Sequence, residues 1–476
     1  MTDVAELGVT ELASRLQRRE LSAGEVTGAL LERIRKVDGT HSHQGDPDSI
    51  NAWVRVYEED ALEAASRADE RLSEAAVRRD GPAPPLTGVP IGLKDLYGVA
   101  EKPVTASSGF FEEVPKQDCD AWARLSAAGM VLLGHLHTHE FAVGGTTDQV
   151  GSPWDLSRSP GGSSGGSAAA LAARMTPAAT GTDTAGSLRI PSACCGTSAI
   201  KPTRGLVSLA GVVPLSWSLD HAGPMARSIA DCGLLLEAMA GPDRLRAESA
   251  LHAPLSPAGS ATTTLDGVRL AVSPRIAEVE LDADVAAGFD AALDACRRLG
   301  AVLVEARAPE EHGPVGDDFL DVLTTDLLTY HRRFDAQRDR YRDSIREWLE
   351  EGERRAVTGE AYVAAQERRR WLTGAWAAWL TEHRVDAIVE PTIPVVAPPR
   401  GDGYDHWGTD YALISLTHLW DWTGFPAAAL PSGVGRSGLP VGVSLIGPAG
   451  ADLRVTSFAV ALQRELGVPE PPVPAA

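Results

Sequence analysis

The sequence predicts an α/β fold. Short apolar runs typical of buried strands, such as residues 89–93 and 268–272, alternate along the chain with longer segments of helical periodicity. Apolar residues make up 43% of the composition, which is enough for a sizeable buried core. On length alone, 476 residues would correspond to about three domains, and no internal repeat or low-complexity block divides the chain.

The first part of the chain is predicted to be mainly helical. Residues 8–36 predict two helices, and Ser22 with Glu25 forms a capping-box pattern at the start of the second. Residues 57–79 predict a charged, alanine-rich helix that ends before a Gly-Pro pair. The apolar run at 89–93 then predicts a buried strand. Further elements are predicted at 118–128 (helix), 131–133 (strand) and 168–175 (a helix of small residues).

The second half of the chain follows the same alternation. Residues 253–266 are rich in Ser, Pro, Ala and Thr and predict a surface connection. A strand over 268–272 and a helix over 283–299 follow. Residues 316–385 are mostly helical and charged, and residues 385–389 predict a strand that runs into a Pro-Thr-Ile-Pro segment.

Two loops rich in glycine and serine carry the strongest functional signal. The first is Pro-Gly-Gly-Ser-Ser-Gly-Gly-Ser at 160–167, and the second is Gly-Thr-Asp-Thr-Ala-Gly-Ser-Leu-Arg at 181–189. Glycine allows backbone conformations that other residues avoid, so the serine hydroxyls can be held in place with little bulk around them. A helix is predicted to begin near Ser187, with Pro191 in its first turns. The two loops together predict a hydrolytic site that contains two serines.

These loops resemble the signature of the amidase signature family of serine hydrolases. Further motifs extend the resemblance to about residues 86–447: Gly-Val-Pro-Ile-Gly-Leu-Lys-Asp at 88–95, Lys-Pro-Thr-Arg-Gly at 201–205, Ser-Leu-Asp-His-Ala-Gly-Pro-Met-Ala-Arg at 218–227, and shorter matches at 431–433 and 438–442. Several long motifs in one order are far more specific than a single short pattern. The resemblance implies one large domain over residues 1–476, with a mixed, twisted β-sheet that helices flank. Its signature core would span about 86–240, and a variable helical region over about 316–385 would shape the substrate pocket.

The resemblance also implies which residues are catalytic. Carried over onto matching positions, the family's triad falls on Lys94, Ser163 and Ser187, with Ser187 as the nucleophile and a cis peptide bond before Ser163. The two serines are 187 − 163 = 24 residues apart, as in the family. The N–H groups that bind the oxyanion map to Thr184, Ala185, Gly186 and Ser187. Ala185 departs from the family's usual glycine, and its methyl group would narrow one wall of the site.

These residue types suit the cleavage of an amide. A serine hydroxyl is a weak nucleophile until a base takes its proton, and no histidine lies at a matching position. A lysine can be that base if burial lowers its pKa from about 10.4, and Lys94 ends an apolar run. Ser163 would relay the proton from Ser187 to Lys94 and later return it to the leaving amine. We expect no cofactor and no metal ion.

Other residues are expected to support the site or to line it. Ser164, Asp183 and Arg189 are predicted to hold the nucleophile loop without taking part in the chemistry. Candidates for the substrate pocket are Gly144, Gly145, Trp217, Trp407 and Trp420, and Trp422 lies in the same aromatic stretch. Three more tryptophans are predicted to be core residues: Trp371, Trp376 and Trp379.

Composition restricts the partners. The net charge of −21, from 65 acidic and 44 basic residues, disfavours nucleic acid and anionic membranes. No run approaches the length of a membrane span, and the N-terminus lacks the features of a signal peptide. Five cysteines without a CxxC pair are typical of reduced thiols, so we expect a cytoplasmic protein. The expected partner is a small-molecule substrate, and the expected assembly is a monomer or a homodimer.

Three local patterns allow other interpretations. The alternating His135, His137 and His139 could bind zinc if a strand presented them, although structural histidines are the favoured interpretation. The first glycine loop could cradle a phosphate, but the Gly-Lys-Ser/Thr ending of a P-loop is missing. Cys194 and Cys195 would need a basic partner to act as nucleophiles, and packing is the favoured interpretation.

The sequence therefore predicts a hydrolase that cleaves C–N amide bonds of small, fairly apolar, non-peptide substrates through an acyl-enzyme. Esters, anilides and carbamates (urethanes) would be cleaved by the same chemistry. One alternative is the glutaminase subunit of a tRNA-dependent amidotransferase, which would need partner subunits and a charged pocket. The other is a non-catalytic binding module on the same fold, although all three triad positions are intact.

Overall fold

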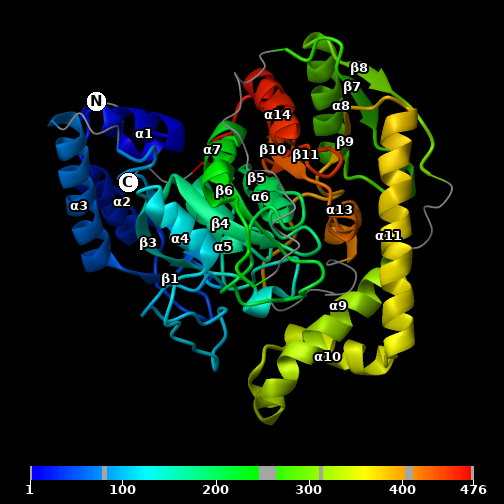
Figure 1. Cartoon of the computed structure of the whole chain (residues 1–476), viewed down its shortest axis with the longest axis horizontal. Helices are drawn as coiled ribbons and strands as arrows, with labels where there is room; N and C mark the ends of the chain where they lie inside the picture. Colours follow the sequence, from blue (N-terminus) through cyan, green and yellow to red (C-terminus); the bar gives the residue numbers. More distant parts are fainter. Residues whose placement is uncertain (1–2, 78–82, 246–263, 310–314, 402–410, 473–476) are drawn as a thin grey trace.

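One large mixed β-sheet runs through the protein, and helices flank it (Figure 1). The computed structural model describes residues 3–77, 83–245, 264–309, 315–401 and 411–472. Within these residues, eleven strands form the sheet in the order β1-β3-β2-β4-β6-β5-β10-β11-β9-β7-β8. Parallel pairs join β2 to β3 and β4, and β7 to β8 and β9, whereas the remaining neighbours are antiparallel. The predicted α/β class and mixed sheet are confirmed.

Four of the strands correspond to the predicted apolar runs: β2 (Pro90–Lys94), β3 (Val131–Leu136), β7 (Arg269–Val272) and β9 (Ala387–Pro391). The sequence does not predict the others: β1 (Trp53–Val56), β4 (Ala178–Asp183), β5 (Ser198–Lys201), β6 (His221–Ala226), β8 (Val302–Val304), β10 (Ala427–Val434) and β11 (Pro440–Ile446). Several of these strands carry Ala, Gly or Pro, which are depleted in strands. Their assignment to the sheet therefore depends on tertiary packing.

The N-terminal helices form a group at one end of the sheet, beside β1 and β3 (Figure 1). They are α1 (Val9–Gln17), α2 (Ala23–Val37) and α3 (Glu58–Val77), after a 3₁₀ turn at Val4–Glu6. Ser22 and Glu25 form the predicted capping box at the start of α2, because each side chain accepts a hydrogen bond from the other residue's backbone N–H. The predicted helices of this region are confirmed.

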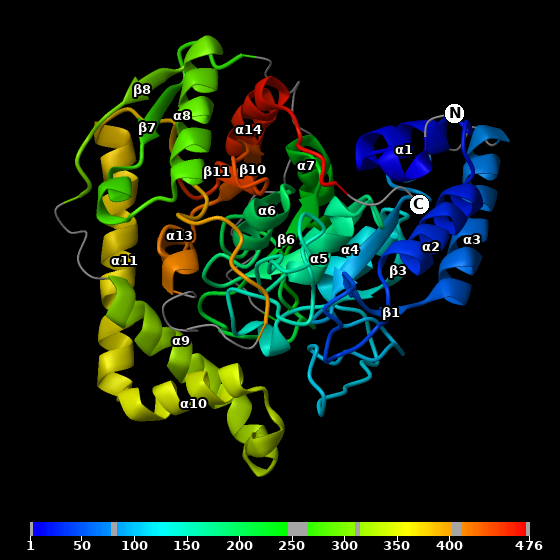
Figure 2. The ribbon, with the colours of Figure 1, turned by 180° about the vertical axis from the view of Figure 1, so that it is seen from behind.

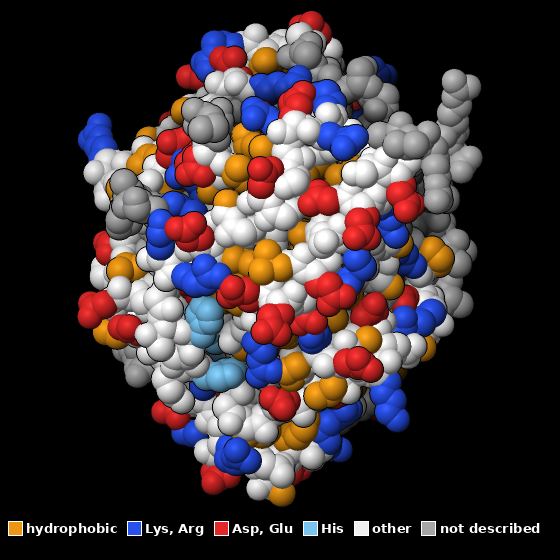
Figure 3. Space-filling model, turned by 90° about the vertical axis from the view of Figure 1, so that its left-hand side faces the viewer, with side chains coloured by type: hydrophobic (Ala, Val, Ile, Leu, Met, Phe, Trp, Pro, Cys, Tyr) orange, Lys and Arg blue, Asp and Glu red, His pale blue; other side chains and the backbone are white. Residues whose placement is uncertain are grey.

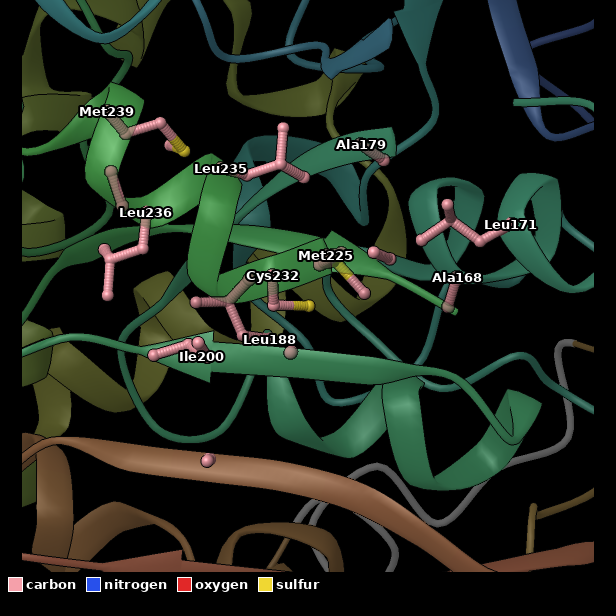
Figure 4. Close-up of a cluster of buried hydrophobic side chains, with 14 of the residues drawn as sticks. Ala168, Leu171, Ala179, Leu188, Ile200, Met225, Cys232, Leu235, Leu236 and Met239 are labelled. Atoms are coloured by element: carbon pink, nitrogen blue, oxygen red, sulfur yellow. The ribbon is translucent and has the colours of Figure 1, made fainter. Parts of the chain in front are cut away.

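A second set of helices packs against the central strands: α5 (Gly165–Ala172), α6 (Arg189–Cys195), α7 (Ile229–Met239), α8 (Ala283–Arg298) and α14 (Asp452–Leu466). Helix α4 (Asp120–Ala127) contacts α7. Figure 4 shows Leu235 and Cys232 of α7 among the apolar side chains of the strands, with Met225 of β6 and Ile200 of β5 nearby. These side chains are fully buried, so the core continues without a break around the strands that carry the glycine-rich loops.

The region over 316–385 is mostly helical, as predicted, and contains several separate helices. It comprises α9 (Val315–His331), a 3₁₀ segment at Arg332–Arg340, α10 (Asp343–Arg355) and α11 (Gly359–Glu382). Helices α9 and α10 contact each other and form a hairpin, while α11 runs along the edge of the molecule that faces away from α3 (Figure 2). A short helix, α13 (His418–Thr423), lies between α11 and the sheet. Residues 253–263 of the predicted surface connection lie outside the described residues.

The surface carries charges of both signs. On the face shown in Figure 3, acidic and basic side chains are interspersed, and hydrophobic side chains form only small groups. In the parts of the chain that the structure describes, none of the helices has the length and apolar character needed to cross a membrane.

Candidate active site

The geometry of the sheet brings the two glycine-rich motifs together. Lys94 is the last residue of β2, and Asp183 is the last residue of β4. The two strands are parallel neighbours, so both end at the same edge of the sheet. The loop that contains Ser187 follows β4, and the loop that contains Ser163 immediately precedes α5. Lys94, Ser163 and the Ser187 loop consequently meet at one point of this edge.

The Lys94 side chain is fully buried and surrounded by hydroxyl groups. Its Nζ lies 2.8 Å from Ser163 Oγ, 2.9 Å from Ser164 Oγ and 2.9 Å from Thr182 Oγ1. Burial lowers the pKa of Lys94 to about 7, although the negative charges of Asp183 and Asp220 raise it in part. The lysine is therefore close to the balance between ammonium and amine at neutral pH.

The hydrogen-bond partners of the two serine hydroxyls indicate which serine can exchange a proton with Lys94. Ser164 Oγ donates to the carbonyl oxygen of Thr182 at 3.3 Å, so it can only accept from the lysine. Ser163 Oγ has no such carbonyl acceptor among the described residues, and its proton is free to move towards a neutral Nζ. Ser164 thus accepts a hydrogen bond from Lys94, and Ser163 contacts Lys94 with its own proton uncommitted to a carbonyl of the described residues.

The backbone before Ser163 has the form that the resemblance implies. The Gly162–Ser163 peptide bond is cis. A side chain at Gly162 would collide with the backbone of Thr146, whose carbonyl oxygen would lie 2.1 Å from an added Cβ. Only glycine therefore fits beside Thr146 at this point of the loop.

Ser187 faces a cavity rather than a hydrogen-bond partner. Its side chain is 7% exposed and lines the cavity together with Thr184 and Ala185. No hydrogen bond joins its hydroxyl to Ser163 or to any other residue that the structure describes. The contact between Lys94 and Ser163 is thus present, and the contact between Ser163 and Ser187 is not made in this state.

Of the four backbone N–H groups predicted to bind an oxyanion, one is already occupied. The Gly186 N–H donates to Asp183 Oδ1. The N–H groups of Thr184, Ala185 and Ser187 have no acceptor among the described residues. Gly186 has a φ of 136°, and a Cβ there would lie 2.4 Å from Thr417 Oγ1. Gly186 therefore shapes the loop, while its neighbours retain donors that an oxyanion could use.

A buried ion-pair network holds the nucleophile loop. Arg189 donates from Nε to Asp183 Oδ2 at 2.9 Å and from Nη2 to Asp421 Oδ2 at 2.6 Å, and its Nη1 donates to the carbonyl of Thr417 at 3.0 Å. Burial would raise the pKa of Asp183, but the Arg189 guanidinium outweighs it and holds that pKa below its usual value. Burial and the charge of Asp183 raise the pKa of Asp421. Asp183, Arg189 and Asp421 of α13 are thus joined in one buried network beside the Ser187 loop.

Removal of the Arg189 charge should destabilise the protein strongly. In Arg189→Met, the Asp183 and Asp421 carboxyl groups would remain buried without their shared guanidinium, which costs roughly 3–5 kcal/mol for a broken buried pair. Arg370→Met is a matched control, because the Arg370 side chain is 71% exposed and, among the described residues, pairs with Glu367 alone; it should change stability by about 0.5 kcal/mol or less. Urea unfolding measures both. A loss below about 1 kcal/mol in Arg189→Met would contradict a structural role for this network.

The cavity beside Ser187 is small and has a mainly apolar wall. Gly144 and Gly145 line it, as the sequence predicts. The remaining lining residues are Ala142, Val143, Thr184, Ala185, Ser187, Ile190, Leu215, Leu323, Trp348 and Ile414. None of the described lining residues carries a charge. The sequence does not single out Leu323 and Trp348, because apolar residues at helical spacing predict core packing equally well.

The tryptophans do not form the predicted pocket wall. Trp420 is fully buried, stacks on Phe425 and donates from its indole nitrogen to Glu390, so it belongs to the core. Trp217 is 36% exposed and packs edge-on against Tyr330, away from the cavity lining. Trp422 is also buried, and Trp407 lies outside the described residues. Trp376 and Trp379 are core residues as predicted, but Trp371 is 58% exposed, which corrects the prediction for it.

The histidine run does not assemble a metal site. His135 bonds to Tyr57 Oη at 2.8 Å and to the Tyr97 carbonyl at 3.0 Å, and His137 Nδ1 lies 3.1 Å from Ser107 Oγ. In the described part of the chain, His, Cys, Asp and Glu do not gather in a group of three or more that could hold a metal ion. Burial raises the pKa of the Cys194 and Cys195 thiols, which leaves both as unreactive, protonated core residues.

Comparisons with known proteins show similarity to amidases over most of the chain. A family model described as Amidase matches residues 25–456. The chain is 37% identical over 447 residues to an amidase of Pseudomonas putida, with 92% of each chain covered. It is 36% identical over 512 residues to the A subunit of the glutamyl-tRNA(Gln) amidotransferase of Salinispora arenicola, with 99% of this chain and 100% of that one covered. The structure of the native peptide amidase of Stenotrophomonas maltophilia matches with a TM-score of 0.80 at 28% identity and 99% coverage of both chains.

Proposed function

Since the chain belongs to the amidase family and is an amide-hydrolysing enzyme, we propose that it cleaves small, uncharged amides through an acyl-enzyme on Ser187. One observation carries this proposal. Lys94, which is buried and has a pKa of about 7, lies 2.8 Å from the Ser163 hydroxyl. Ser187, at the same edge of the sheet, faces an apolar cavity. That arrangement supports the proposal that Lys94 acts as the base, Ser163 as the relay and Ser187 as the nucleophile.

In the acylation step, the neutral Lys94 amine takes a proton from Ser163 as Ser163 takes one from Ser187. Ser187 Oγ forms a bond to the substrate carbonyl carbon, and the resulting oxyanion accepts hydrogen bonds from the free N–H groups of Ala185 and Ser187. Lys94 then returns the proton through Ser163 to the nitrogen of the leaving group as the C–N bond breaks. The hydrogen bond between the two serines forms in the substrate complex, because catalytic hydrogen bonds commonly tighten only there.

Water completes the cycle. It attacks the acyl carbon and loses its proton to Lys94 through Ser163, after which Ser187 departs from the tetrahedral intermediate and regains a proton by the same path. Because the leaving group is expelled in the first half-reaction, esters, anilides and carbamates would enter the same cycle.

The cavity favours an uncharged, apolar substrate. Val143, Leu215 and Ile414 lie beside Ser187, and charged side chains are absent from the described lining. A free amino acid carries an ammonium and a carboxylate, and placing these charges in such a cavity without partners is very costly. The apolar lining therefore supports an apolar amide as the substrate.

The second candidate is glutamine hydrolysis within an amidotransferase. It is favoured by the relatives that are named as the A subunits of glutamyl-tRNA(Gln) amidotransferases. It would require groups that pair with the two charges of glutamine, and partner subunits would receive the ammonia. The lining of the cavity supports this candidate less well than it supports an apolar amide.

A substrate panel tests the proposal. We expect kcat/KM for butyryl p-nitroanilide to exceed that for free glutamine by at least about 100-fold. The reason is that the two charged groups of glutamine would stay unpaired in the apolar cavity. Release of nitroaniline and of ammonia measures the two reactions under the same conditions. Phenyl butyrate and a phenyl carbamate extend the panel to esters and carbamates. Preferential turnover of glutamine, or copurification with amidotransferase subunits, would instead establish the second candidate.

A further inference from the structure

Two bulky side chains of the α9–α10 hairpin reach the cavity beside Ser187. Leu323 of α9 and Trp348 of α10 are 6% and 7% exposed, and both line the cavity. The rest of the lining comes from other parts of the chain: residues 142–145, the nucleophile loop with Ile190, Leu215 and Ile414. Trp348 is the largest side chain of the described lining, so it occupies space that a substrate would otherwise use.

The hairpin is tied to the core on the α9 side. The Asp326 carboxylate accepts hydrogen bonds from Ser216 Oγ at 2.6 Å, the Ser218 N–H at 3.1 Å and Tyr362 Oη at 3.0 Å. Ser216 directly follows Leu215, which is part of the cavity lining. Helix α9 is therefore tied to the segment that contributes Leu215 to the lining.

The α10 side is tied to the loop that carries Gly144. The backbone N–H of Arg342, just before α10, donates to Glu140 Oε2 at 2.8 Å, and Ser344 Oγ lies 3.3 Å from His139 Nε2. The His139 ring in turn lies close under Gly144, since an added Cβ there would be 2.7 Å from the ring. These contacts fix the distance between Trp348 and the glycine pair.

Aromatic packing reinforces the turn between the two helices. The Phe141 ring lies 4.7 Å from His331 and 5.9 Å from Phe334, measured between ring centroids, and Tyr341 lies 4.7 Å from Phe110. Phe141 directly precedes the cavity-lining Ala142. These aromatic contacts thus hold the hairpin in place as one wall of the cavity.

We infer that Trp348, with Leu323 beside it, sets the maximum size of the acyl group that this enzyme accepts. The inference rests on the proposed function, in which the acyl group stays bonded to Ser187. The amine must leave towards solvent, whereas the acyl group stays on Ser187, beside the apolar lining of the cavity. A bulky indole in this lining leaves less room for long or branched acyl chains, so the enzyme prefers short ones.

A series of acyl p-nitroanilides, from acetyl to octanoyl, tests the inference in the full-length protein. The readout is the ratio of kcat/KM for octanoyl over acetyl substrates, which cancels general losses of activity. Trp348→Ala should raise this ratio by at least about tenfold, because a hydrophobic pocket discriminates about 10- to 200-fold per methylene. Leu323→Ala should raise it less. Trp371→Ala is the matched control, since Trp371 is 58% exposed on α11, and it should leave the ratio unchanged.

Trp348→Phe and Trp348→Leu provide the test if the alanine variant does not fold, and their ratios should lie between those of the wild type and the expected alanine value. Labelling rates with alkyl fluorophosphonates of increasing chain length give a second readout, because the alkyl group stays attached to the serine. An unchanged ratio in active variants would overturn the inference and leave the proposed function intact. Absence of both turnover and labelling in the wild-type protein would contradict the proposed function, and the inference with it.

Discussion

Replacement of Ser187 by alanine should abolish amide hydrolysis. The expected loss in kcat is on the order of 10⁶-fold, as for the removal of the nucleophile from other serine hydrolases. Covalent labelling by a fluorophosphonate should disappear at the same time, because the other hydroxyl of the described lining, that of Thr184, already donates to Asp220. Intact-protein mass spectrometry measures the labelling, and nitroaniline release measures the turnover. Both readouts also separate an enzyme from a binding module on the same fold.

Ser192→Ala is the matched control for this experiment. Ser192 lies on α6, and its buried hydroxyl has no hydrogen-bond partner among the described residues. Its removal should leave labelling and turnover unchanged. Undiminished labelling of Ser187→Ala, with the modified peptide mapped to another serine, would disprove the assignment of the nucleophile.

Replacement of Lys94 by alanine should have the second largest effect. We expect amide turnover to fall on the order of 10⁴-fold, the upper range for loss of a general base. Ester cleavage should fall less, because an alkoxide or phenoxide leaves more readily than an amine and needs less help from the returning proton. Rates for the paired anilide and phenyl ester of one acid measure this difference.

Lys102→Ala controls for the loss of a lysine. Its side chain pairs with the exposed Asp60, and its removal should leave both rates unchanged. Lys201 is the other fully buried lysine of the described chain, and burial lowers its pKa to about 8. If Lys201 were the base, Lys94→Ala would retain most of its activity, which would contradict the account.

The sequence allows prediction of the contact between Lys94 and Ser163 but of only a part of the cavity lining. The glycine-rich motifs have a fixed spacing, and Lys94 at the end of β2 lies 2.8 Å from Ser163, whereas Ser187, in the loop after β4, has no hydrogen bond to Ser163. Strand β4 itself is not predicted, because its Ala-Ala-Thr-Gly-Thr-Asp sequence lacks the branched and aromatic residues that favour strands. The small residues there allow α5 to pack closely against the strand.

The structure differs from the prediction for two of the tryptophans, Trp217 and Trp420, for a related reason. Tryptophan can fill a core or line a cavity, and its position in the sequence does not distinguish the two. Trp420 is predicted to line the pocket but fills the core, while Trp348, which lines the cavity, lies in an ordinary amphipathic helix. Gly186 is predicted to contact the oxyanion, but the Asp183 carboxylate accepts its N–H. Only the folded chain shows that competition.

The pH dependence of kcat/KM for an uncharged anilide tests the central claim most directly. Lys94 must be neutral to accept a proton, and its pKa lies at about 7. The rate should therefore rise about tenfold per pH unit below pH 7 and level off above it. In Lys94→Ala, the residual rate should show no inflection near pH 7. A rate that is constant from acid to alkaline pH, or the same inflection in Lys94→Ala, would show that Lys94 is not the base.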